Sequence, residues 1–148
     1  MSGTDPAEAI TRASASNLAL AFIALDPARR RAISVFYAFC RLVDDLGDAG
    51  DLAPEERAAG LDLWERALDA PQPGESPVAA AAREVFAGFR VDPLLPKAIL
   101  EGVRLDLAGT RYETWEDLDR YCWHVASAVG LVSAEIFGYT NPRTREYA

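Results

Sequence analysis

The sequence predicts an all-α protein folded as one domain. Apolar residues recur at intervals of three and four along most of the chain, which is the spacing of one helix face. Prolines separate these segments, and no segment shows the strict alternation of a half-buried strand. With 148 residues, 50% of them hydrophobic, the chain is long enough to bury one substantial core.

Prolines mark the starts of the helices expected in the first half of the chain. Pro6, Pro27 and Pro54 each stand at the first turn of an apolar-periodic segment, where proline is well tolerated. The segment 71–77 is expected to be a loop because it is rich in proline and glycine. The sequence therefore predicts helices over approximately residues 6–25, 28–46 and 55–68.

The second half of the chain carries equally clear boundaries. Pro93 separates two helices, Thr114 and Asp117 resemble a capping box, and Gly138 suits a helix end. Residues 143–148 look like the first turn of a further helix, which predicts that the chain is part of a larger functional unit. The expected helices run over approximately residues 78–89, 95–108 and 115–137.

Composition limits the partners that the protein can have. The formal net charge is −8, the pI is near 4.6, and no basic stripe is present, so nucleic acid is excluded as a partner. Cys40 and Cys122 lie in apolar patterns, which predicts reduced core thiols of a cytoplasmic protein. The uncharged runs are shorter than the ~20 residues that span a membrane, so any membrane contact would be peripheral.

Three aspartates at the end of the helix expected over 28–46 are the strongest chemical signal. Asp44, Asp45 and Asp48 form the pattern D-D-x-x-D, and Asp44 and Asp48 share one helix face because they are four residues apart. Carboxylates so placed repel each other by roughly a few tenths of a kcal/mol. A hard cation such as Mg²⁺, shared with a substrate phosphate, would explain the pattern. The alternative is a helix end that runs into a solvated acidic loop.

The same helix carries an apolar stripe that ends at these aspartates. Its members follow three- and four-residue spacing: Ile33, Phe36, Tyr37, Cys40 and Val43. Asp44 lies four residues after Cys40 and is therefore expected to extend the inward face. Arg41 either pairs with the neighbouring carboxylates or clamps a phosphate through two hydrogen bonds.

The helix expected over 115–137 offers a second candidate face. Tyr121, Val125 and Ala128 share it, and the small residues around Gly130 permit close helix packing or leave space for a ligand. A buried tyrosine hydroxyl needs a partner, which for Tyr121 is either a phosphate or a backbone group. His124 is the only histidine and is expected to be structural.

Three blocks of the sequence resemble the squalene/phytoene synthase family over about residues 13–139. The first is the segment 12–18, and the second is 36–48, which contains the aspartate motif. The third begins at 101 and continues through Asp106 and the pair 111–112 to the segment 121–130. Enzymes of this family join two isoprenoid diphosphates head to head.

The resemblance implies an isoprenoid synthase-type helical bundle around a deep central cavity. It implies Mg²⁺ bound against a substrate diphosphate by three carboxylates: Asp44, Asp45 and Asp48. Three side chains would line the polar end of the cavity and take part in catalysis: Tyr37, Arg41 and Tyr121. Other side chains would contact the isoprenyl diphosphate substrates: Ser16, Leu18, Phe36, Cys40, Asp106, Val125, Ala128 and Val129.

The chain also departs from the family. Ala15, Asn17 and Leu18 replace residues that are often Ser, Ser and Phe, and no second aspartate-rich motif follows within the 148 residues. We therefore expect the N-terminal portion of a single domain, incomplete at its C-terminal side and inactive alone. The expected reaction converts two farnesyl diphosphates to presqualene diphosphate, and the alternative makes phytoene from geranylgeranyl diphosphate. A non-catalytic helical subunit that keeps the family fold is the alternative from another class, and the sequence predicts no oligomeric state.

Overall fold

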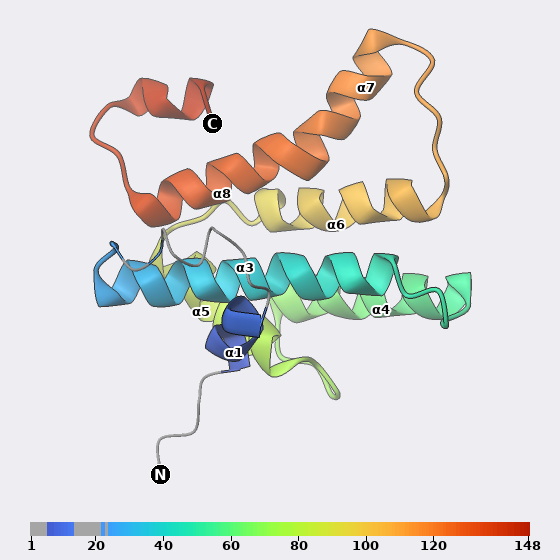
Figure 1. Ribbon diagram of the computed structural model, residues 1–148, viewed down its shortest axis with the longest axis horizontal. Helices are drawn as coiled ribbons and strands as arrows, with labels where there is room; N and C mark the ends of the chain where they lie inside the picture. The colour runs from blue at the N-terminus through green and yellow to red at the C-terminus, as the bar shows by residue number, and fades with distance from the viewer. Residues whose placement is uncertain (1–5, 14–21, 23) are drawn as a thin grey trace.

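The computed structural model describes residues 6–13, 22 and 24–148 of the chain (Figure 1). The described part contains helices and connections without a strand, so the all-α prediction is confirmed. The α-helices are α1 (Pro6–Ala13), α3 (Pro27–Gly47), α4 (Pro54–Asp69), α5 (Pro77–Gly88), α6 (Leu94–Leu107), α7 (Trp115–Cys122) and α8 (Ala128–Phe137). The chain also forms a π-helical segment, η1 (Trp123–Ser127), and a 3-10 helix, η2 (Pro142–Glu146).

Helix α3 runs through the middle of the molecule (Figure 1). It contacts α1, α4 and α5 on one side and α6 and α8 on the other. Asp26 caps its start by accepting a hydrogen bond from the Arg29 backbone N–H at 3.0 Å, and Pro27 occupies its first turn. The predicted second helix is therefore confirmed to within a few residues.

An aromatic cluster on one face of α3 forms the centre of the core. Phe39 is fully buried, and its ring meets Trp64 of α4 edge-on at 5.5 Å and Phe86 of α5 at 5.8 Å. Phe36 lies 6.2 Å from Phe86 in a similar T-shaped contact. Such edge-to-face pairs stabilise beyond the area that they bury, and they join α3, α4 and α5 into one layer.

The expected boundaries of the other helices are mostly confirmed. Pro54 and Pro77 stand at the first turns of α4 and α5, and Thr114 caps α7 by accepting from the Asp117 N–H. The expected first helix begins at Pro6 as α1, but most of its remaining length lies outside the described residues. The expected helical turn at 143–148 is the 3-10 helix η2.

The helix expected over 115–137 is continuous but not uniform. Its middle, Trp123–Ser127, is π-helical, so the chain advances by more residues per turn there than in α7 and α8. Gly138 ends the helix with a positive φ of 76°, which glycine adopts readily, and its N–H donates to the Ala134 carbonyl. The π segment was not predicted, because a sequence pattern analysed at 3.6 residues per turn assumes a regular helix.

Helix α7 projects away from the bundle (Figure 1). None of its residues is buried, and Trp115 is 80% exposed. The prediction that both cysteines are core residues is therefore wrong for Cys122, which is exposed, whereas Cys40 is half-buried. Among the described residues, no helix has both the length and the apolar character that crossing a membrane requires.

Two glycines set the spacing between helices near the candidate site. A Cβ on Gly47 of α3 would lie 2.6 Å from Cγ1 of Val103 on α6. A Cβ on Gly102 of α6 would lie 2.8 Å from Cγ1 of Val125 and 3.2 Å from Cβ of His124, both in η1. These distances are too short for carbon atoms, so α6 can approach its neighbours this closely only because a side chain is missing.

We expect Gly102→Ala to lower the free energy of unfolding by about 1–3 kcal/mol, because the added methyl group overpacks the contact between α6 and η1. Gly88→Ala is the matched control, since no atom lies within 4 Å of the Cβ that it adds. The control should be neutral or stabilising by up to about 1 kcal/mol. Urea unfolding of both variants measures this, and equal stability of Gly102→Ala and the wild type would contradict the tight contact.

Candidate functional site

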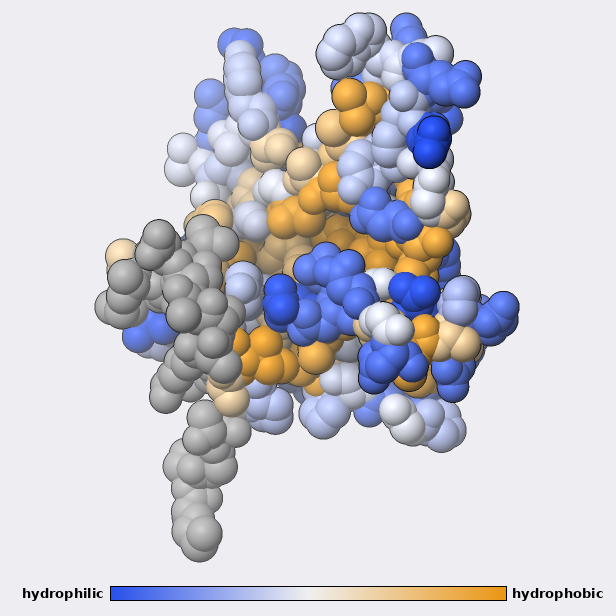
Figure 2. Space-filling view, turned by 45° about the vertical axis from the view of Figure 1, so that its right-hand side comes forward, coloured by the Kyte–Doolittle hydropathy of each residue, from blue (hydrophilic) through white to orange (hydrophobic). Residues whose placement is uncertain are grey.

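A pocket of about 370 Å³ lies where α3, α6 and the helix formed by α7, η1 and α8 come together. Each helix contributes residues at the spacing of one face, so the pocket follows from the helical periodicity of three segments. The space-filling view shows apolar side chains gathered in a hollow among polar ones (Figure 2). The lining residues are Tyr37, Cys40, Arg41, Asp44, Ile99, Val103, Asp106, Tyr121, Val125 and Val129.

Most of the predicted site residues meet in this pocket. From α3 come Tyr37, Cys40, Arg41 and Asp44, which are three, one and three residues apart and therefore lie on one face. Two lining residues were not predicted, Ile99 and Val103 of α6. Their spacing of four, with Asp106 three residues further on, was a signal in the sequence that could have identified them.

Two predicted substrate contacts lie in the core of the described structure and do not line the pocket. Phe36 is 2% exposed and packs against the aromatic cluster, on a different face of α3 from the pocket residues. Ala128 is fully buried, and Val129 lines the pocket one position later. The π segment explains why Val129 lines the pocket, because it places Tyr121, Val125 and Val129, each four residues apart, on one face. The predicted contacts Ser16 and Leu18 lie outside the described residues.

Arg41 is surrounded by the aspartates that end α3. Its Nη2 lies 2.7 Å from Oδ1 of Asp45, and its Nη1 lies 3.8 Å from Oδ2 of Asp44. Arg41 and Asp44 line the pocket, and Asp45 is held beside them by the ion pair. The guanidinium is half-exposed, so it can exchange a carboxylate for a phosphate at small cost, since exposed ion pairs contribute about 0–1 kcal/mol.

Asp44 reaches the pocket but is not buried in it. Its side chain is 62% exposed, which corrects the expectation that it faces inward, away from water. Its pKa is nevertheless raised, first by partial burial and then by the negative charge of Asp48, which outweigh the nearby Arg41 guanidinium. An aspartate with a raised pKa beside a second carboxylate is a site where a cation would be stabilising.

The described part of the chain does not form a complete metal site. Within residues 6–13, 22 and 24–148, no cluster of three or more Asp, Glu, His or Cys side chains is arranged to hold an ion. Asp44 and Asp48 nevertheless fit Mg²⁺, which is commonly held by one or two carboxylates together with substrate phosphates and water. The donor set is therefore suited to an ion that arrives with a phosphorylated ligand.

Tyr121 is the phenol of the pocket whose surroundings are best defined. A hydrogen bond to the Asp106 carboxylate, followed by burial, raises the pKa of Tyr121 to about 12. Its ring lies against that of Tyr112, with centroids 4.8 Å apart and planes 32° apart. Tyr121 therefore keeps its proton at neutral pH and acts as a hydrogen-bond donor fixed between α6 and the loop after it.

Residues 11–148 match the squalene/phytoene synthase family. The chain belongs to this family. It is 36% identical over 138 residues to the 15-cis-phytoene synthase of Synechococcus elongatus, covering 92% of the chain and 44% of that relative. It is also 36% identical over 138 residues to the presqualene diphosphate synthase of Zymomonas mobilis, covering 91% of the chain and 47% of that relative. The chain thus spans less than half the length of these relatives.

Two further side chains of this squalene/phytoene synthase family member have structural roles. Burial, and then the charge of Asp44, raise the pKa of the Cys40 thiol to about 12, so Cys40 is a neutral part of the pocket wall and not a nucleophile. The Nδ1 atom of His124 lies 2.6 Å from the Arg120 carbonyl oxygen, within its own helix. This contact fits the expected structural role of His124.

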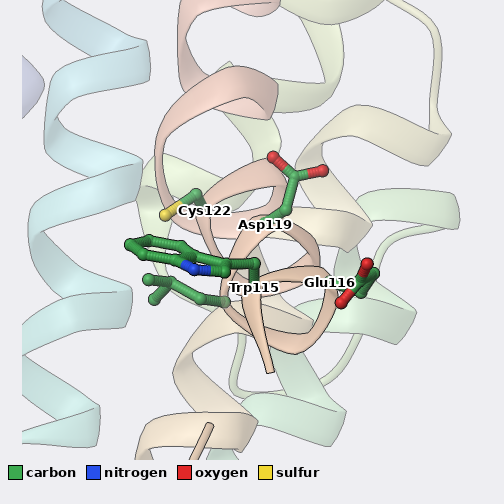
Figure 3. Close-up of a pocket in the computed structure, with 5 residues that line it drawn as sticks. Trp115, Glu116, Asp119 and Cys122 are labelled. Carbon is green, nitrogen blue, oxygen red and sulfur yellow. The ribbon is translucent and has the colours of Figure 1, made fainter. Parts of the chain in front are cut away.

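A second hollow of about 440 Å³ lies along α7 and holds none of the predicted site residues. Trp115 and Cys122 point to the same side of the helix, whereas Glu116 and Asp119 point elsewhere (Figure 3). Leu118 also lines it. The hollow combines exposed apolar and acidic side chains without a basic group, so it is unsuited to a diphosphate.

The raised pKa of Asp44 predicts a pH-dependent cost of keeping this carboxylate in the ligand-free fold. Because the folded-state pKa is above the unfolded one, ionised Asp44 lowers stability at pH 7, and this loss disappears as the pH falls through the raised pKa. Asp44→Asn should therefore melt at a higher temperature than the wild type at pH 7 without divalent cations. The difference should vanish below about pH 4, where both folded and unfolded carboxyls are protonated.

The control is Asp51→Asn, which removes the same charge from an exposed loop residue. It corrects for the general effect of neutralising one aspartate in a chain of net charge −8. Thermal melts from pH 3 to pH 8 provide the comparison. If Asp44→Asn is less stable than the wild type at pH 7, the carboxylate is stabilised by its neighbours and the argument for a cation site fails.

Proposed function

We propose that this chain provides the first diphosphate-binding half of a Mg²⁺-dependent synthase that joins two isoprenyl diphosphates head to head. The observation that carries the proposal is the lining of the 370 Å³ pocket. Arg41, Asp44 and Tyr121 come from two different helices and meet above an apolar wall. That combination suits a ligand with a charged head and a hydrocarbon tail.

Each polar group of the pocket has a distinct part in binding such a ligand. The guanidinium of Arg41 can donate two parallel hydrogen bonds to phosphate oxygens. The protonated hydroxyl of Tyr121 can donate a further one. Asp44 and Asp48 would hold Mg²⁺ against the diphosphate, and the ion would stabilise the charge that develops on the leaving oxygen as the allylic C–O bond breaks.

The apolar wall serves the other product of that bond cleavage, an allylic carbocation. Ile99, Val103, Val125 and Val129 offer it no nucleophile and exclude water from one side of the pocket. The neutral thiol of Cys40 is also a poor nucleophile. These residues support capture of the cation by the second prenyl substrate in preference to capture by water.

The size of the pocket supports the idea that this chain holds only part of the reaction. Ligand pockets usually measure about 300–1,000 Å³, and a pocket of about 370 Å³ is at the small end of that range. It suits one diphosphate and the beginning of its tail. Two prenyl substrates would need further walls, consistent with relatives that are more than twice as long as the matched region.

Farnesyl diphosphate, giving presqualene diphosphate, is our first proposal for the substrate and product. Geranylgeranyl diphosphate, giving phytoene, is the second candidate, and it is favoured by several relatives that are phytoene synthases. Identity does not separate the two, because the phytoene synthase of Pseudescherichia vulneris and the presqualene diphosphate synthase of Zymomonas mobilis are both 36% identical to the chain. The two substrates differ in the length of the prenyl tail, and the part of the cavity that would bind the end of the tail lies beyond the polar end described above.

A non-catalytic subunit that retains the family fold is the competing proposal. Such a subunit would not need Arg41, Asp44 and Tyr121 together on one pocket, so their convergence favours the enzyme. Binding of Mg²⁺ and a prenyl diphosphate distinguishes the two proposals, because only the enzyme requires it.

We expect the melting temperature of the chain to rise when Mg²⁺ and a non-reactive farnesyl diphosphate analogue are added together. A ligand present at 100 times its Kd stabilises the folded state by about 2.7 kcal/mol, which corresponds to a shift of several degrees. Neither ligand alone should produce the full shift, because Asp44 and Asp48 would hold the metal together with the diphosphate. Differential scanning fluorimetry measures the shift.

Asp44→Ala should abolish this shift, and Asp51→Ala, on the adjacent exposed loop, should leave it intact. A shift of equal size in Asp44→Ala would contradict the proposed metal position. A full shift with the analogue in the absence of Mg²⁺ would contradict a role for the metal.

We also expect the 148-residue chain by itself to form no condensation product. It carries one aspartate-rich motif, and its pocket accommodates one diphosphate. The assay is incubation with Mg²⁺ and radiolabelled farnesyl or geranylgeranyl diphosphate, followed by extraction and chromatography of the lipids. The Synechococcus elongatus phytoene synthase serves as the positive control for the geranylgeranyl arm. Product above the background of the Asp44→Ala variant would overturn this expectation.

A further inference from the structure

The hydroxyl of Tyr112 is buried without a hydrogen-bond partner among the residues that the structure describes. Buried polar groups are nearly always paired, because an unpaired one loses its bonds to water and gains nothing in return. A phenylalanine would fill the same space without that cost. The presence of a hydroxyl here therefore indicates a second state in which it has a partner.

The surroundings of Tyr112 indicate what that partner is. Its ring packs on the ring of Tyr121 with centroids 4.8 Å apart. Burial, and then the charge of Asp106, raise the pKa of Tyr112, whereas the pKa of Tyr121 is raised first by its hydrogen bond to Asp106. In the ligand-free structure Asp106 accepts its hydrogen bond from Tyr121. Two phenols, packed with their ring planes 32° apart, thus lie near one carboxylate, and Tyr121 is hydrogen-bonded to it whereas Tyr112 is not.

We propose that Tyr112 is a positioning residue. Its hydroxyl donates a hydrogen bond to the Asp106 carboxylate when Tyr121 turns its own hydroxyl to a bound diphosphate. The proposal rests on the proposed function, because the diphosphate is the group that withdraws Tyr121. It adds a residue outside the pocket lining, since Tyr112 is not among the lining residues and packs against Tyr121, which is.

The exchange follows from the number of available protons. Tyr121 has one hydroxyl proton, so it cannot donate fully to Asp106 and to a phosphate oxygen at the same time. Without a replacement, redirecting Tyr121 would leave Asp106 as an unpaired carboxylate beside a negatively charged ligand. The Tyr112 hydroxyl removes that cost because it is already desolvated, and its ring packs against that of Tyr121, near enough to Asp106 to feel the charge of the carboxylate.

Tyr112→Phe and Tyr121→Phe test the exchange without any ligand, because each removes one hydroxyl and keeps the stacked ring. In the wild-type background, Tyr112→Phe should leave the unfolding equilibrium constant unchanged or lower it, since the hydroxyl removed is unpaired. In the Tyr121→Phe background, Asp106 has lost its hydrogen-bond donor, and the Tyr112 hydroxyl should donate to Asp106 instead. There, Tyr112→Phe should raise the unfolding constant about fivefold.

The matched control is Tyr139→Phe, which removes a hydroxyl that is bonded to Oε1 of Glu135 at 3.0 Å, beyond the far end of α8. Its effect should be the same in both backgrounds, because separate sites are additive. Equal effects of Tyr112→Phe in the two backgrounds, or a destabilised single variant, would overturn the proposal. Carbon-13 labelling of the tyrosine Cζ atoms gives a second measurement, because the Tyr112 resonance should move in Tyr121→Phe; a resonance that does not move also overturns it.

The ligand arm of the test uses Mg²⁺ with inorganic pyrophosphate and measures affinity by calorimetry. The Tyr112→Phe variant should bind about five to ten times more weakly than the wild type, since it cannot replace Tyr121 at Asp106. Equal affinities would overturn the exchange while leaving the proposed function intact. If neither protein binds, the proposed function fails, and the diphosphate-driven exchange fails with it, whatever the ligand-free cycle shows about the two hydroxyls.

Discussion

The burial of one face of α3 is the constraint on which the rest of the structure depends. Phe39 is enclosed by Trp64 and Phe86, so α3 cannot rotate about its axis without breaking the aromatic cluster. Tyr37 and Arg41 are on an adjacent face, and their direction is set by the same packing. The pocket is therefore positioned by apolar contacts that take no part in its chemistry, and its polar groups need not hold one another in place. This is why Arg41 can remain half-exposed, with one close ion pair to Asp45 at 2.7 Å and a longer one to Asp44 at 3.8 Å.

The second wall of the pocket depends on a departure from regular helix. The π segment Trp123–Ser127 adds residues to one turn, so α7 and α8 differ in the faces that they present to α6. Because Gly102 lets η1 approach α6 closely, Val125 of this segment reaches the pocket. Interruptions of this kind lose regular hydrogen bonds and are frequent at functional sites. Here the π segment joins a projecting helix, which carries Tyr121, to a packed helix, which carries Val129.

Helical periodicity predicted much of this arrangement, and its failures have identifiable causes. The helix boundaries and the pocket face of α3 followed from proline positions and from three- and four-residue spacing. The burial of Phe36 in the core did not follow from the pattern, because an apolar stripe does not say which of two adjacent faces meets the core. Ala128 was chosen in addition to Val129 because the π turn has no sequence signal at a period of 3.6. The exposure of Cys122 depends on how far α7 projects, which is a tertiary property.

Electrostatics explains how a chain of net charge −8 is suited to a diphosphate ligand. At the pocket, Arg41 is the cation that faces Asp44 and Asp106, so by itself it does not make the local potential positive. Partial burial, and then the negative charge of Asp48, raise the pKa of Asp44, and a diphosphate alone would add to the negative charge. In our proposal a divalent ion would reverse the sign, because the carboxylates of Asp44 and Asp48 would attract it and it would then attract the phosphates. Metal and diphosphate are therefore expected to bind cooperatively, each weakly without the other, which keeps the site from holding either one alone.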